Sequence, residues 1–331
     1  MGPMDRTDRD EPTCGMCGAV LDGRSLFRAE AMGTAYEILA CARCGGGATF
    51  PVPSPGELSR FYGFRSYRAD DGARFNALVE GVVGWARGAR RRRVERLAGR
   101  RGRLLDVGCG RGLFLRRMHR AGWDVAGVEA DAAVARAISG AHGLDVRAGD
   151  PDGWDFPDGS FDAVTLHHVL EHVPHPMDMI GGCRRLLRDG GLLVAAVPNR
   201  HSLQAAFGRG SWFHLDVPFH LHHFTASGLA GLLERSGFRV VRERHLDLEQ
   251  NLFGWAQTIL NRCGLPRNLL YEFLKRPTLR DDATVEGRGW KVAVSFALLP
   301  LILPAGAVLT LLEAAGRRGG TVEIAAVKEG T

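Results

Sequence analysis

The stretch Arg103-Leu-Leu-Asp-Val-Gly-Cys-Gly-Arg-Gly112 decides the fold of this 331-residue chain. Its apolar first half predicts a short buried strand, and its glycines predict a tight turn that leads into a helix. The next apolar run, residues 123–128, is followed by an acidic residue, Glu129. A glycine-rich turn after one strand and a carboxylate after the next are typical of a nucleotide-cofactor site in a doubly wound α/β sheet, where the carboxylate accepts the ribose hydroxyls.

The spacing of the glycines separates two kinds of cofactor. A dinucleotide site uses the pattern G-x-G-x-x-G, in which the third glycine lets the helix pack closely on the strand. Here Gly108, Gly110 and Gly112 give G-x-G-x-G, and Asp106 precedes them within the strand. This spacing disfavours an NAD-dependent reductase.

The motif Leu-Asp-Val-Gly-Cys-Gly-x-Gly resembles the first motif of class I S-adenosylmethionine-dependent methyltransferases. The resemblance continues through Ala148-Gly-Asp150, Pro157-Asp-Gly-Ser-Phe-Asp-Ala-Val164 and His168-Val-Leu-Glu-His172, and covers residues 60 to 245. It implies a Rossmann-like seven-stranded sheet with an antiparallel last strand, and S-adenosylmethionine as the cofactor. By the same resemblance Glu129 binds the ribose, the glycine turn borders the methionine part, and residues 150–151 border the adenine. The implied cofactor-binding residues are Asp106, Gly108, Cys109, Gly110, Gly112, Glu129, Ala130, Asp150, Pro151 and His167.

From residue 103 onward, apolar runs of strand length alternate with segments of helix length, which predicts a mostly parallel sheet covered on both faces. We expect Gly190 and Gly191 to end the third helix of this series. The predicted strands are 103–108, 124–129, 144–148, 161–166, 191–197 and 238–245, with 321–328 as the antiparallel strand. The predicted helices of this series are 112–121, 131–141, 176–188 and 226–237, and a further helix over 73–98 precedes the series.

Composition and sequence pattern also predict the organisation of the chain. A hydrophobic content of 45% with 24% charged residues is typical of a globular protein and excludes a disordered one. The polar first residues show no secretory signal, and seven cysteines without such a signal indicate the cytoplasm. The predicted parts are a disordered tail (1–12), a zinc-ribbon module (13–56), the cofactor-binding core (57–245), a helical insertion (246–320), and the final strand with its tail (321–331).

Four cysteines form two Cys-x-x-Cys pairs near the start of the chain. Cys14 and Cys17 make the first pair, and Cys41 and Cys44 the second, each followed directly by glycine. Two such pairs supply the four thiolates of a tetrahedral structural zinc site. We therefore expect zinc that folds a small ribbon, with a redox dithiol as the alternative.

Two histidine-rich segments follow predicted strands at the edge where such sheets bind ligands. One is residues 167–172, and the other begins with His214 and continues through 220–223. Histidine can remove a proton from an acceptor near neutral pH. The resemblance favours His172 and His223 as catalytic residues, then His222, with Glu171 orienting His172. A structural role for these histidines, or a metal ion bound by Glu171 and His172, remain alternatives.

The insertion contains an apolar run, residues 292–312, that has no charged residue. Its length would cross a membrane, but the chain must return to the cytoplasmic sheet. Pro300 and Pro304 therefore predict a break and a shallow in-plane or re-entrant hairpin on the inner face of the membrane. A cap buried on the protein or in a dimer is the alternative.

Charge adds a second indication about partners. The net charge is +6, and the run from Arg87 to Arg103 is strongly basic. This run is either a solvated helix face or an attractor of anionic lipid or a phosphorylated substrate. No nucleic acid is expected, because no aromatic platform accompanies the arginines.

Taken with the resemblance, these features favour an enzyme that methylates an oxygen or carbon atom of a saccharide, a lipid-linked molecule or another amphiphilic small molecule. The alternative is a non-catalytic scaffold that binds the cofactor and recruits a partner through its ribbon.

Overall fold

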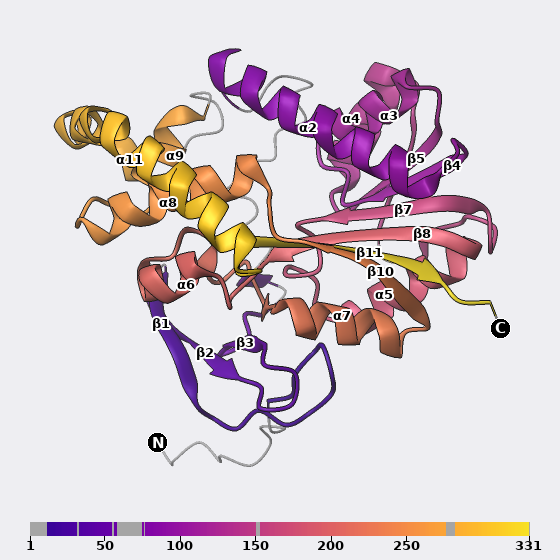
Figure 1. Ribbon diagram of the computed structural model, residues 1–331, viewed down its shortest axis with the longest axis horizontal. Coiled ribbons are helices and arrows are strands. Elements are labelled where there is room, and N and C mark those ends of the chain that lie inside the picture. The colour runs from indigo at the N-terminus through magenta and orange to yellow at the C-terminus, as the bar shows by residue number, and fades with distance from the viewer. Residues whose placement is uncertain are drawn as a thin grey trace.

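The computed structural model describes residues 12–31, 33–54, 56–57, 75, 77–149, 153–275 and 282–330. Its centre is a seven-stranded sheet in the order β10-β11-β8-β7-β4-β5-β6 (Figure 1). The last strand, β11, runs antiparallel to both of its neighbours, whereas β4 to β8 pair in parallel. This confirms the Rossmann-like sheet with an antiparallel last strand. The strands are β4 (Arg103–Val107), β5 (Asp124–Glu129), β6 (Asp145–Ala148), β7 (Phe161–His167), β8 (Leu187–Pro198), β10 (Phe238–Arg244) and β11 (Thr321–Lys328).

Helices cover both faces of this sheet because successive strand residues point to opposite sides. In β4, Leu104 packs into the cluster that contains residues of α2, α3 and α4, and Leu105 packs into the cluster of α5 and α7. Both leucines are fully buried. The helices are α2 (Ala77–Ala98), α3 (Leu113–Arg120), α4 (Ala132–His142), α5 (Pro176–Leu186) and α7 (Ala226–Arg235).

The prediction that Gly190 and Gly191 end the third helix is wrong. Helix α5 ends at Leu186, and β8 begins at once with Leu187. The register of β8 against β7 then shifts, since Leu187 pairs with Phe161 but Leu192 pairs with Ala163. Gly190 has φ of 70°, so the two glycines form this irregularity inside the strand rather than a helix stop.

The N-terminal module is a small sheet that the core completes. Its strand order is β1-β2-β3-β9. The fourth strand, β9, consists of two residues that lie more than 170 positions after β3 in the sequence. Gly47 and Ala48 of β3 pair with His223 and His222 of β9. The ribbon is therefore joined to the core by a shared sheet. In Figure 1 the strands β1 to β3 lie below α6 (Leu203–Gly208) and α7. The bounds are β1 (Ser25–Ala31), β2 (Thr34–Ala40), β3 (Gly47–Phe50) and β9 (His222–His223).

The insertion between β10 and β11 is helical, and its apolar run is one continuous helix. Helix α11 (Gly289–Ala315) contains Pro300 and Pro304 in its interior, so the predicted break is wrong. Packing against α8 offsets the cost of the prolines, because Gly306 allows Leu252 and Trp255 to approach α11 closely. The other short elements are α6 (Leu203–Gly208), η2 (Arg209–Ser211), η3 (Phe213–Leu215), α8 (Leu248–Arg262), α9 (Leu269–Leu274) and α10 (Asp282–Val285).

Buried polar side chains fix both ends of the insertion to the sheet. Asn251 of α8 donates to the backbone oxygen of His245, just after β10, and accepts from the backbone N–H of Thr321 in β11. At the end of α11, the Glu313 carboxylate accepts hydrogen bonds from Gln204 and from the backbone of Gly320. The insertion is thus held at its entry and its exit.

The basic helix α2 is held against the core by ion pairs. Arg93 makes a bidentate pair with Glu323 of β11, with N···O distances of 3.0 and 2.9 Å. Arg90 lies 3.8 Å from the Asp247 carboxylate. Other arginines of the run also pair with carboxylates of the protein, namely Arg87, Arg91, Arg100, Arg101 and Arg103. Most of the run is therefore paired within the protein rather than forming an unpaired solvated face.

Candidate active site

The glycine turn after β4 has a backbone that needs glycine. Gly108, Gly110 and Gly112 have φ of 66°, 54° and 67°, a region that other residues rarely adopt. A Cβ on Gly108 would lie 2.5 Å from a methyl group of Val169. A Cβ on Gly110 would meet no heavy atom of the described residues within 4 Å. The turn therefore packs on the segment after β7 and leaves open space beside Gly110.

Glu129 lies at the end of β5, next to this turn. Its Oε2 accepts a hydrogen bond from the backbone N–H of Gly110 at 2.9 Å. Burial raises the pKa of Glu129, although backbone N–H groups, Gly110 first, oppose the shift. The structure thus places Glu129, the residue predicted to bind the ribose, at the edge of the open space.

Asp106 is buried beneath the turn. The Thr165 hydroxyl of β7 donates to the Asp106 carboxylate at 2.6 Å, and burial raises the pKa of Asp106 to about 7. Thr165 pairs with Asp106 in the sheet register, a contact that no local sequence signal predicts. Asp106 and Thr165 are both buried, so their hydrogen bond supports the glycine turn from within the sheet.

The other predicted cofactor residues vary in position. Cys109 is buried, with its sulfur near Gly127, and Ala130 is exposed. The His167 ring contacts Phe114 edge-on, with centroids 5.4 Å apart, and burial lowers the pKa of His167 well below its usual value. Asp150 and Pro151 lie outside the described residues. The described residues fit a nucleoside, because they provide a carboxylate for a ribose and a backbone without side chains for close approach.

A histidine cluster stands beyond the carboxyl end of β7, beside the glycine turn. The Nδ1 of His172 lies 3.0 Å from the backbone oxygen of Phe219, and the Nδ1 of His220 lies 2.9 Å from that of His214. A carbonyl oxygen can only accept, so both Nδ1 atoms carry a proton, and in the neutral rings Nε2 has the lone pair. The two rings are 4.7 Å apart.

Glu171 is the acidic member of this cluster and is 1% exposed. Its Oε1 accepts from Nδ1 of His168 at 3.2 Å, whereas its Oε2 has no hydrogen-bond partner among the described residues. Burial would raise the pKa of Glu171, but the hydrogen bond from His168 and the nearby histidines bring it down to about 2. Its backbone oxygen accepts from Leu221 and His222, which fixes the segment with His220 against it.

His222 and His223 occupy a different position, between the ribbon and the core. His223 is 3% exposed, and its Nε2 lies 3.0 Å from the Thr49 hydroxyl. That hydroxyl donates to the backbone oxygen of His220 at 2.6 Å. The His222 ring lies against Gly15, and its Nε2 is 3.2 Å from the oxygen of Pro174. The structure therefore brings Glu171 and His172 together with His220, and places His222 and His223 against the ribbon.

The four ribbon cysteines converge. One ligand atom from each lies within 4.8 Å of the others. The sulfurs of Cys14 and Cys44 are 3.5 Å apart, as are those of Cys17 and Cys41. Tetrahedral zinc with Zn–S bonds of about 2.3 Å requires sulfur separations of about 3.8 Å. The cluster fits a structural zinc ion.

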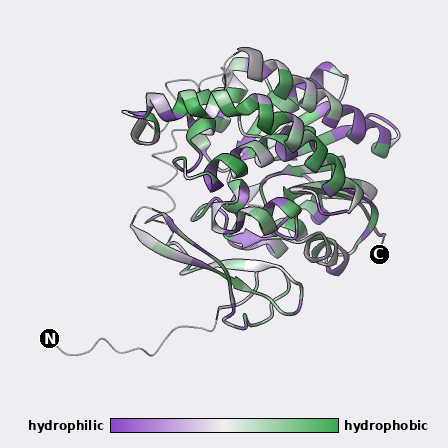
Figure 2. Cartoon of the chain, turned by 60° about the vertical axis from the view of Figure 1, so that its left-hand side comes forward, coloured by the Kyte–Doolittle hydropathy of each residue, from purple (hydrophilic) through white to green (hydrophobic). Residues whose placement is uncertain are grey.

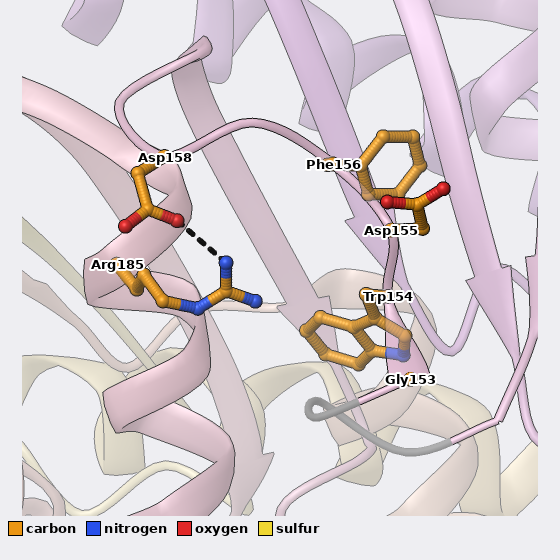
Figure 3. A pocket seen from close by; sticks show the side chains of 6 residues that line it. All are labelled: Gly153, Trp154, Asp155, Phe156, Asp158 and Arg185. Carbon is orange, nitrogen blue, oxygen red and sulfur yellow. Dashed lines mark hydrogen bonds and ion pairs between the residues drawn. The ribbon is translucent and has the colours of Figure 1, made fainter.

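A separate surface pocket is lined by none of these groups. Figure 3 shows the residues that line it. It is lined by residues that precede β7 and by Arg185 near the end of α5, which pairs with Asp158 at 2.5 Å. Because β7 begins there, this pocket is at the amino edge of the sheet, opposite the glycine turn. It contains none of the predicted site residues.

Comparisons with known proteins agree with this geometry. A family model described as a methyltransferase domain matches residues 83–243. A ubiquinone biosynthesis O-methyltransferase of Cereibacter sphaeroides is 31% identical over 165 residues, which cover 46% of this chain and 67% of that protein. A probable S-adenosylmethionine-dependent methyltransferase of Mycolicibacterium smegmatis is 33% identical over 150 residues, which cover 45% and 56%. A solved S-adenosylmethionine-dependent methyltransferase of Archaeoglobus fulgidus aligns with a TM-score of 0.45 at 20% identity, covering 73% of this chain and 94% of that one. The ribbon and the insertion both lie outside the family match.

Proposed function

Because this chain belongs to the class I S-adenosylmethionine-dependent methyltransferases, we propose that it methylates an oxygen or carbon atom of a saccharide, lipid-linked or other amphiphilic small molecule. The observation that carries this proposal is the packing of the glycine turn on Val169, in the segment that also contains Glu171 and His172. Val169, which packs on Gly108, is adjacent to His168 and three residues from His172. A cofactor in the turn and an acceptor at the cluster would therefore be neighbours.

Different residues of the chain would bind the cofactor and the acceptor. S-adenosylmethionine supplies a methyl group on a sulfonium, which is already a good leaving group. Glu129 would bind the ribose hydroxyls, and the open side of Gly110 would receive the methionine part. Glu171, His172 and His220 would bind and activate the acceptor, so that its nucleophilic atom is held in line with the methyl group.

Among the predicted catalytic histidines, the geometry favours His172. It is half-buried and keeps its Nε2 lone pair, as argued above. His223 is enclosed, and its Nε2 faces the Thr49 hydroxyl, so we assign His222 and His223 to holding the His220 segment in place. Membership in an enzyme family speaks against the scaffold alternative. A reductase-like Tyr-x-x-x-Lys spacing does occur at Tyr271 and Lys275, but Lys275 is ion-paired with Glu272 in the insertion.

Single-turnover methyl transfer tests the assignment of His172. We expect His172→Ala to slow the step by about 100-fold or more, which is the range for removal of an acid–base or acceptor-orienting group. S-adenosylhomocysteine affinity should stay unchanged, because His172 does not line the glycine turn. His175→Ala, an exposed histidine three residues away, serves as the matched control. Equal rates in the His172 variant and the wild type would remove His172 from the chemistry.

The apolar insertion supports an amphiphilic acceptor and contact with an anionic membrane at the cytoplasmic face. Helix α11 is apolar along most of its length (Figure 2), and it is long enough to cross a membrane. Only 22% of its apolar 18-residue window is buried. Leu301, Val308 and Leu311 are 73%, 58% and 59% exposed. Arginine and lysine residues stand near both ends of the helix, where they would meet anionic headgroups. All seven cysteines are free, which is consistent with a reducing compartment.

Flotation with vesicles that contain phosphatidylglycerol tests this contact. We expect the wild type to float and the double variant Leu301→Asp/Leu311→Asp to stay in solution, because charge at the apolar face opposes insertion. Val241→Asp, at an exposed valine on β10, is the matched control and should float. A wild type that does not bind the vesicles, or a double variant that binds them equally, would contradict the membrane proposal.

A further inference from the structure

The cluster of Glu171, His172 and His220 has the composition of a metal site. One possible ligand atom from each of the three lies within 4.8 Å of the others. Two imidazoles and one carboxylate form a set that first-row divalent cations bind, with further positions left open. The set has no cysteine, so its chemistry differs from that of the ribbon cluster.

The hydrogen bonds of the two rings prepare them as ligands. Each Nδ1–H is directed at a backbone oxygen, of Phe219 for His172 and of His214 for His220. Such bonds fix the tautomer and the ring orientation of metal-binding histidines and leave Nε2 for the ion. Both acceptors are backbone oxygens, so the main chain sets the orientation of each imidazole ring.

The carboxylate has an oxygen that nothing in the described part of the chain satisfies. Glu171 is 1% exposed, and its Oε2 lacks a hydrogen-bond partner there. A buried carboxylate oxygen without a partner is costly, and a bound cation would remove that cost. The backbone of Glu171 is held by Leu221 and His222, so the carboxylate and the His220 ring cannot separate freely.

We propose that Glu171, His172 and His220 bind a divalent first-row transition-metal ion, at a second metal site separate from the four ribbon cysteines. Ligand bonds of about 2.1 Å would draw the three side chains closer together. The preference for imidazole and carboxylate over thiolate separates this ion from the structural zinc.

The role of this ion rests on the proposed function. An acceptor hydroxyl bound at an open position would lose its proton to water. The acceptor oxygen then forms a bond to the methyl carbon while the carbon–sulfur bond breaks, and the electron pair stays on sulfur. His172 would act here as a ligand rather than as a free base, and its replacement would still slow the reaction.

Cobalt binding to the full-length protein with zinc already in the ribbon tests the site without any turnover. By equilibrium dialysis against Co²⁺ we expect one cobalt ion per chain. Its visible absorption should lack the intense sulfur-to-cobalt charge-transfer band of a thiolate site. Glu171→Gln and His220→Ala should each weaken cobalt binding by at least about 10-fold, and His175→Ala should leave it unchanged. Circular dichroism and S-adenosylhomocysteine affinity check that the variants fold.

The outcomes separate this proposal from the proposed function. No cobalt beyond the ribbon, or undiminished binding in both variants, overturns the metal site even if methyl transfer proceeds. Cobalt lost in the variants supports the site even if no tested acceptor is methylated. Should Glu171→Gln not fold because its amide is buried, His220→Ala alone decides the question.

Discussion

Replacement of Glu129 by alanine is expected to abolish most of the affinity for S-adenosylhomocysteine. The carboxylate would accept two hydrogen bonds from the ribose, and hydrogen bonds to a charged group each contribute about 1.5–3 kcal/mol. A loss of ~3 kcal/mol corresponds to roughly 100-fold weaker binding. Isothermal titration calorimetry with the wild type and Glu129→Ala measures this difference. Glu129→Gln should fall in between, since an amide can still accept one bond but carries no charge.

The control is on the same strand. Asp124 lies at the opposite end of β5 and is exposed, so Asp124→Asn changes the same charge without reaching the glycine turn. We expect its affinity to match the wild type. Equal affinity in Glu129→Ala and the wild type would contradict the ribose assignment, because no described carboxylate other than Glu129 accepts from the turn's Gly110.

We expect the four converging cysteines to bind zinc, and removal of that zinc should slow methyl transfer while cofactor binding survives. Structural zinc contributes about 10–16 kcal/mol of apparent free energy to small modules that bind it, so the ribbon should unfold without it. Thr49 of β3 would then release the backbone of His220, and β9 would lose its partner strand. Among the described residues, the hydrogen bonds of Glu129 join it to Gly110 and Asp131 rather than to the ribbon. We therefore expect a rate loss of at least about 10-fold, with S-adenosylhomocysteine affinity within about a factor of two.

Cys41→Ser measures this effect, because it removes one ligand of the cluster. Cys263→Ser is the matched control, since Cys263 is free and exposed and lies in the loop after α8. A milder variant, Thr49→Val, keeps the zinc and deletes only the hydroxyl that contacts His220 and His223. It should lower the rate without the proteolytic sensitivity expected of Cys41→Ser. Full activity in zinc-free protein would show that the ribbon does not position the cluster.

The sequence predicts the central sheet well because its signals are local. The strands β4, β5 and β7 each contain a short apolar run, and the turn after β4 needs glycine at three positive φ angles. The pairs Cys14/Cys17 and Cys41/Cys44 predict the cysteine cluster for a similar reason, since the spacing itself makes two ligand turns. In both cases the residues that determine the structure lie within a few positions of one another in the sequence.

Contacts between distant residues were harder to predict. Nothing in the sequence near His222 or His223 indicates that they extend a sheet formed by residues 25–50. The prediction of His223, and after it His222, as catalytic residues could therefore not take this pairing into account. His220 differs from its neighbours only in where its ring points, which depends on the backbone oxygen of His214. Pro300 and Pro304 predict a break by local rules, and only the packing of α8 on Gly306 explains the continuous helix. Tertiary contacts decide these cases.

The way the insertion is tied at both ends bears on how the protein would meet a lipid bilayer. Asn251 joins the entry to His245, just after β10, and to Thr321 of β11, and Glu313 joins the exit to Gly320, just before β11. An anchor held at two adjacent points cannot pivot as a single flexible tether would. The enzyme would therefore bind the bilayer with one orientation and at one distance from its surface. The distance from the acyl chains of the bilayer to the methyl donor would then be fixed by the fold. An amphiphile would be selected by the position of its reactive atom along the molecule, and not by its headgroup alone.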